Sequence, residues 1–185
     1  MGFFKRQLSI DDAMRTMLAA VLSRRPADVL AELFVNEQLS SVDANAIGQE
    51  LFGFDVAIVH MLFLQMHGEL LEPTEFGRRF SIALRRALVG SGLPILAAAE
   101  RALHGIDLAI TYSENLDSIP EADVRQYGPF AYLCQDFTRR IEGNVDLRKE
   151  RARDRHFKLF SVAQQNYQAV RLLFEKVQSD ALVIA

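Results

Sequence analysis

The chain has 185 residues, of which 50% are hydrophobic and 24% charged, with a formal net charge of −3. This length is enough for one substantial core and short for two, and the composition is that of an ordinary soluble globular domain. A single cysteine excludes an internal disulfide and fits a reducing compartment. Charged residues precede any apolar run that could form a signal peptide, so we expect a cytoplasmic protein.

Helical segments separated by glycine and proline fill the chain, and no Asn-Gly or Asp-Gly hairpin signal occurs. Ser9 with Asp12 resembles a capping box at the start of the first helix, and Pro26 suits the first turn of the second. Gly53 either breaks the third helix from the fourth or only kinks a longer one. The predicted helices span residues 10–24, 26–38, 41–53, 55–71, 73–90, 94–117, 119–128, 130–143 and 146–185.

These elements predict an all-α, single-domain multi-helix bundle over residues 1–185, with a long C-terminal helix. The most apolar run, Val56 to Leu64, is interrupted by His60. It is also far shorter than the roughly 20 residues that a helix needs to cross a bilayer. We therefore expect no transmembrane segment.

Two histidines lie seven residues apart in the segment DVAIVHMLFLQMHGELL, residues 55–71. At about 100° per residue, His60 and His67 fall about 20° apart, on a face opposite the polar residues of this helix. Their spacing of about 10.5 Å along the axis is too long for one shared metal ion. We expect neutral, buried, structural histidines. The alternative is a pocket for an apolar ligand or haem, lined by His60, Phe63, Leu64 and His67.

Glu100, His104 and Asp107 share one face of the helix predicted over residues 94–117. A carboxylate, an imidazole and a carboxylate at this spacing could chelate a divalent metal or perform acid–base chemistry. A polar stripe is also what any amphipathic helix presents to water. We favour the solvated face and keep the metal site as a weak alternative, with no cofactor predicted. The apolar residues expected to pack in the core are Leu96, Ala99, Leu103, Ile106 and Ile110.

The arginines of GRRFSIALRRALV, residues 77–89, occupy one side of a predicted amphipathic helix. We interpret this side as a solvated face, although Ile82 and Val89 among the arginines leave room for an anionic or membrane-surface partner. Cys134 shares a face with apolar residues, which indicates a small buried hydrophobe and not a catalytic thiolate.

The last helix changes character halfway along its length. Its second half carries an apolar seam with the 3-4 spacing of a heptad repeat, which we expect to pack inside the bundle. Self-association through part of this seam and the apolar tail, residues 181–185, is a further hypothesis. The seam residues are Phe160, Ala163, Tyr167, Val170, Phe174, Val177 and Ala181.

The first half of that helix is basic, because residues 139–158 contain eight Lys or Arg and four Asp or Glu. This leaves −7 for the rest of the chain, which disfavours nucleic acid as a partner. We predict a partner-binding basic patch for an acidic protein surface, made of Arg148, Lys149, Arg151 and Arg155.

The sequence thus predicts a helical protein-interaction or scaffold module without catalytic activity, with a protein partner and homo-oligomerisation as expectations. A small-molecule-binding domain using the pocket near His60 and His67 is the alternative. A metal-assisted enzyme using Glu100, His104 and Asp107 is the third hypothesis.

Overall fold

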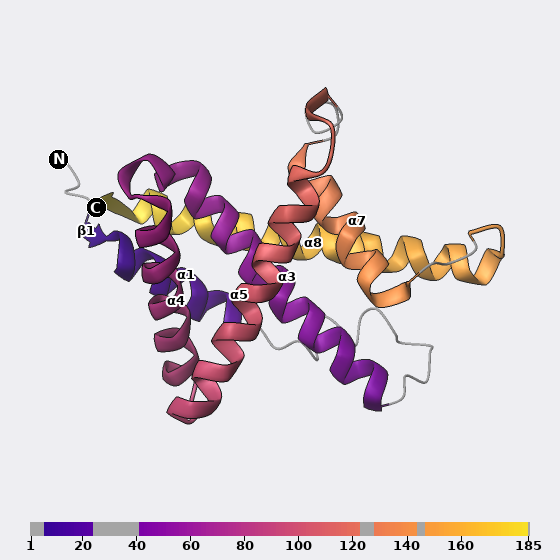
Figure 1. Cartoon of the computed structure of the whole chain (residues 1–185), viewed down its shortest axis with the longest axis horizontal. Helices are drawn as coiled ribbons and strands as arrows, with labels where there is room; N and C mark the ends of the chain where they lie inside the picture. The colour runs from indigo at the N-terminus through magenta and orange to yellow at the C-terminus, as the bar shows by residue number, and fades with distance from the viewer. Residues whose placement is uncertain (1–5, 24–40, 123–127, 144–146, 185) are drawn as a thin grey trace.

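The computed structural model describes residues 6–23, 41–122, 128–143 and 147–184 of the chain. Six α-helices make up most of it, and a helical bundle with a long last helix is the architecture observed (Figure 1). The predicted all-α bundle is therefore confirmed. The helices are α1 (Ile10–Leu22), α3 (Ser41–His67), α4 (Pro73–Gly90), α5 (Ile95–Asp117), α7 (Pro129–Glu142) and α8 (Glu150–Asp180), with a 3₁₀ turn at Gly68–Leu70.

The helix boundaries follow the capping signals of the sequence. The Ser9 hydroxyl accepts the Asp12 backbone N–H at 3.2 Å and donates to the Asp12 carboxylate at 2.9 Å, which confirms the predicted start of α1. Pro73 begins α4, and Gly143, with a φ of 67°, ends α7. The helix predicted over residues 26–38 lies outside the described residues, as does most of the one predicted after Ser118.

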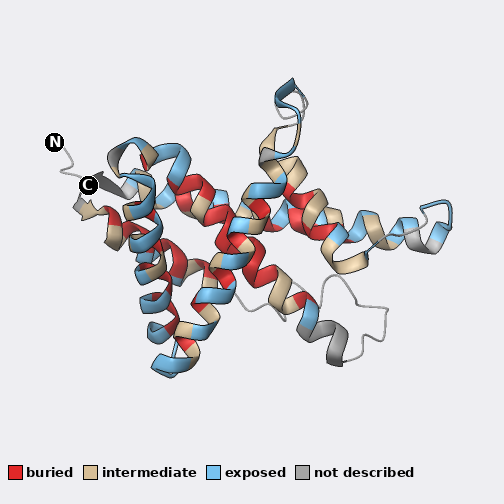
Figure 2. Ribbon diagram, viewed as in Figure 1, coloured by how far each residue is buried: buried red, intermediate tan, exposed pale blue. Residues whose placement is uncertain are grey.

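Helix α3 is the centre of the bundle. It runs unbroken through Gly53, and it packs against α1, α5, α7 and α8. Every residue from 51 to 59 is buried, which explains why the helix is apolar around most of its circumference (Figure 2). The stretch Ala46–His67 is long enough to cross a bilayer, and its most apolar window has a mean hydropathy of 1.5, but 67% of that window is buried inside the structure. Burial of this extent is what a central bundle helix requires.

Two short strands, which the sequence did not predict, join the ends of the described chain. Strand β1 (Arg6–Ser9) pairs in parallel with strand β2 (Ala181–Ile184), with Arg6 opposite Ala181 and Ser9 opposite Ile184. Residues 181–184, predicted as part of the last helix, therefore pair as a strand with the same chain, and the seam residues Ala163, Val170 and Phe174 are buried in the core. Helix α8 starts at Glu150, four residues later than predicted, and measures about 46 Å.

Candidate functional site

The two histidines of α3 lie in different surroundings. The His60 ring meets the edges of Phe76 and Phe80 of α4, with ring centroids 5.4 and 5.0 Å away. Its Nδ1 is buried and has no hydrogen-bond partner among the described residues, and burial lowers the pKa of His60 to about 4. The ring is therefore neutral at physiological pH and acts as an aromatic packing group.

His67 lies at the end of α3, close to α8. Its Nε2 is 3.1 Å from the Gln178 side-chain nitrogen, its ring packs beside Phe63, and burial lowers its pKa. Phe63 is fully buried, whereas Leu64 is 38% exposed. None of these four residues lines any of the four main pockets among the described residues, so a ligand site near His60 and His67 stays a prediction.

The proposed metal ligands Glu100, His104 and Asp107 are all exposed on α5. Across the described residues no three His, Cys, Asp or Glu side chains are placed to hold a metal ion. The interpretation of this stripe as a solvated face therefore fits the structure. Cys134 is buried, and burial raises the pKa of its thiol to about 12, so it stays a protonated packing group.

The predicted basic patch is only partly helical. Arg148 and Lys149 are exposed and precede α8, while the side chain of Arg151 lies outside the described ones. Arg155 extends toward Glu142 of α7, with 3.7 Å between the charged atoms, and His156 Nδ1 is 2.9 Å from the same carboxylate. Part of the patch therefore joins α8 to α7, and its role in binding an acidic partner stays a prediction.

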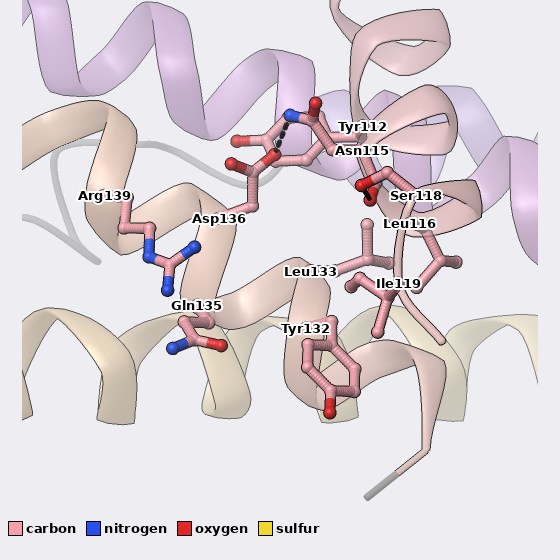
Figure 3. Close-up of a pocket in the computed structure, with 10 residues that line it drawn as sticks. All are labelled: Tyr112, Asn115, Leu116, Ser118, Ile119, Tyr132, Leu133, Gln135, Asp136 and Arg139. Carbon is pink, nitrogen blue, oxygen red and sulfur yellow. Dashed lines mark hydrogen bonds between the residues drawn. The ribbon is translucent and has the colours of Figure 1, made fainter. Parts of the chain in front are cut away.

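A polar network connects α3, α5 and α7 beside a pocket of about 250 Å³ (Figure 3). The Tyr112 hydroxyl donates to Glu50 at 3.4 Å, and Asn115 donates to Asp136 at 2.8 Å. Arg140 lies between the two carboxylates, 3.8 Å from Glu50 and 3.4 Å from Asp136. Burial raises the pKa of Tyr112, so its hydroxyl stays protonated. These groups satisfy one another, as expected of a structural cross-link.

A second buried polar contact connects α3 to α8. Asp55 is 9% exposed and accepts a hydrogen bond from the Asn166 amide, which is 3% exposed. Both residues line a pocket of about 250 Å³, in which the Arg101 guanidinium lies 4.4 Å from the centre of the Phe52 ring. This contact fixes the position of α8 on the central helix.

The outward side of α5 differs from the sequence prediction. Leu96, Leu103 and Ile110, which were expected in the core, are 73%, 62% and 47% exposed. The buried side of α5 is instead lined mainly by small residues. One of them, Gly105, packs directly on Phe52 of α3. A β-carbon on Gly105 would lie 2.9 Å from the Phe52 ring. The buried residues are Ala98, Ala102, Gly105, Ala109 and Tyr112.

Three exposed apolar residues of α5, Leu96, Leu103 and Ile110, repeat every seven positions, as in a coiled-coil helix, and Ile95 at the start of the helix is exposed beside them. A row of carboxylates follows the same repeat four residues later along the chain, and all three are exposed. In the part of the chain that the structure describes, these carboxylates make no ion pair. We call this surface the α5 outer face; it consists of Leu96, Leu103, Ile110, Glu100, Asp107 and Glu114.

Helix α4 presents a surface of the opposite charge. Ile82 and Val89 are each 39% exposed, and Arg85 and Arg86 beside them are exposed. Neither arginine makes an ion pair with any described residue, whereas Arg78 and Arg79 both bind Glu75. We call Ile82, Val89, Arg85 and Arg86 the α4 outer face.

The α5 outer face is a candidate binding surface that the sequence did not reveal. The signal was present in the seven-residue spacing of both its apolar and its acidic residues. It was hidden because an apolar stripe on a helix normally marks the core side. Comparison of the chain with protein-family models, with curated proteins and with solved structures finds no match.

Proposed function

We propose that this chain is a non-catalytic helical interaction module that binds a protein partner through the α5 outer face. The observation that supports it is the exposure of Leu96, Leu103 and Ile110 in one row. Adjacent members of the row are about 10.5 Å apart along the helix, so the row spans about 21 Å. Three large aliphatic side chains in such a row form an apolar stripe of the kind that binds a second helix.

The acidic row beside the apolar one limits the class of partner. A helix that packs on Leu103 would bring its flanking positions close to Glu100 and Asp107. Acidic side chains at those positions would be repelled, and basic ones would be attracted. The proposed partner is therefore a helix with an apolar stripe and basic residues along its edge.

The neutral state of the buried titratable groups agrees with a structural role for the interior. Burial keeps His60 unprotonated and keeps Cys134 and Tyr112 protonated. A nucleophile or general base requires the opposite, a pKa brought toward the working pH. We therefore place the proposed binding function on the surface of the protein.

The test is capture of protein partners by the tagged chain, compared with its Leu103→Asp variant. A charge in the middle of the apolar row should abolish capture, because it would be buried in the complex without a partner. His104→Asp is the matched control, since it introduces the same charge on the same helix one residue outside the row. Equal capture by all three proteins would overturn the proposal.

A further inference from the structure

We propose that the partner of the α5 outer face is the α4 outer face of a second copy of this chain, in a twofold-symmetric dimer. This inference rests on the proposed function and names its partner. Helices α4 and α5 are consecutive, and both carry exposed residues on their outward sides (Figure 2). Each chain therefore contributes both faces, and the same contact forms twice around the symmetry axis.

The charges of the two helices decide which faces meet. Helix α4 has four arginines and one glutamate, a net charge of +3, and α5 has four acidic residues and one arginine, a net charge of −3. Pairing α4 with α4, or α5 with α5, would place like charges side by side. Pairing α4 of one copy with α5 of the other places opposite charges side by side at both contacts.

The spacing of the apolar residues on the two faces matches as well. Ile82 and Val89 are seven residues apart, as are Leu96 and Leu103, so both rows repeat at about 10.5 Å. Arg85 and Arg86 lie about 50° to either side of the row on α4. In the dimer the apolar rows lie against each other, and an arginine of α4 lies beside the acidic row of α5.

The charged residues that would meet make no ion pair with any residue that the structure describes. Among described residues, Arg85 and Arg86 lack an ion-pair partner, and so do Glu100, Asp107 and Glu114. Exposed ion pairs add little affinity, but their arrangement selects the partner and the register. The burial of the apolar rows supplies the affinity.

Exchange of charges between the two faces tests this pairing. The basic-face variant carries Arg85→Glu and Arg86→Glu, and the acidic-face variant carries Glu100→Arg and Asp107→Arg. Each should weaken self-association by roughly a hundredfold or more, because both contacts of its homodimer become repulsive. Mixing the two variants should restore the dimer, because both contacts then join opposite charges. A chain with all four substitutions should dimerise by itself.

The measurement is the mass in solution across a concentration series, by light scattering or sedimentation equilibrium. A control variant with Arg153→Glu and Lys158→Glu, two exposed residues of α8, has the same net charge as the basic-face variant and should dimerise like the wild type. Circular dichroism and a melting curve establish that each variant is folded. Dimers formed equally by all the variants would overturn the pairing of α4 with α5.

A wild-type chain that stays monomeric at high micromolar concentration would overturn the second copy as partner. The alkylation rate of a Leu103→Cys variant then decides the proposed function, since buried Cys134 reacts slowly. Fast alkylation would show that the α5 outer face is accessible. The face could then bind another protein, and only the dimer would be overturned. Slow alkylation shows that the chain covers this face itself and overturns both proposals.

Discussion

Gly53 of α3 lies directly against Leu108 of α5, so that a β-carbon on the glycine would be 2.8 Å from the β-carbon of Leu108. Gly105 of α5 lies against the outer edge of the Phe52 ring of α3, which is 2.9 Å from where a β-carbon on Gly105 would be. The two helices therefore approach each other more closely than side chains on both would allow. This close crossing turns the small residues of α5 inward and leaves Leu96, Leu103 and Ile110 outside.

Gly53→Ala should destabilise the fold, because the new methyl group overlaps an atom that no rotamer of Leu108 can move. Overpacking of this kind costs about 1–3 kcal/mol, which exceeds the roughly 1 kcal/mol that alanine adds to helix propensity. Chemical denaturation measures the difference. Gly48→Ala on the same helix is the control: nothing lies within 4 Å of its β-carbon, so it should stabilise by about 0.5–1 kcal/mol. Equal effects of the two substitutions would contradict the close crossing.

The stability of the protein should depend on the protonation of His60. The folded chain holds its pKa at about 4, against 6.5 for the exposed residue, so the unfolded chain binds more protons between these values. The contribution of neutral His60 to the free energy of unfolding is therefore complete above pH 6.5 and is lost as the pH falls toward 4. The total change is on the order of 3 kcal/mol.

The matched variant for this pH dependence is His60→Phe, which keeps an aromatic ring between Phe76 and Phe80 and removes the titrating group. Free energies of unfolding measured from pH 4 to 7 should converge or cross, with the wild type losing more stability than the variant on acidification. Parallel curves would show that His60 titrates normally in the folded chain.

The contact between Asp55 and Asn166 should contribute measurably to stability. Asn166→Ala removes a hydrogen-bond donor from a buried carboxylate and should cost about 1–3 kcal/mol. The denaturation midpoint should fall without a change in the slope of the transition. Gln165→Ala, at the exposed neighbouring position, should change stability by less than about 0.5 kcal/mol. A loss of the same size in both variants would place the cost in α8 itself and not in this contact.

Local signals in the sequence predicted most of the helix boundaries. Ser9 with Asp12, Pro73 and Gly143 act through their own backbone neighbourhood, so their effect does not depend on the rest of the fold. The parallel pairing of residues 6–9 with residues 181–184 could not be predicted in this way. It joins segments more than 170 positions apart, and it depends on where α1 and α8 bring the two ends.

The α5 outer face could not be predicted from the sequence, because its prediction depends on how α3 and α5 cross. Periodicity showed that α5 has an apolar stripe, but it did not show which side of α5 packs on α3. Gly53 and Gly105 decide this, because they make the small side of α5 the better fit to the central helix. The neutral state of His60, in contrast, was predicted from its position opposite the polar residues of α3, and its lowered pKa agrees with that prediction.

The most direct test of the α5 outer face is the detection of its contacts by nuclear magnetic resonance. In a mixed sample, one set of chains carries labelled Ile methyl groups and the other carries labelled Leu methyl groups. We expect intermolecular nuclear Overhauser effects between Ile82 of one copy and Leu103 of the other. Their absence from a sample that is dimeric by mass, or intermolecular effects confined to α8, would contradict the pairing of α4 with α5 between two copies.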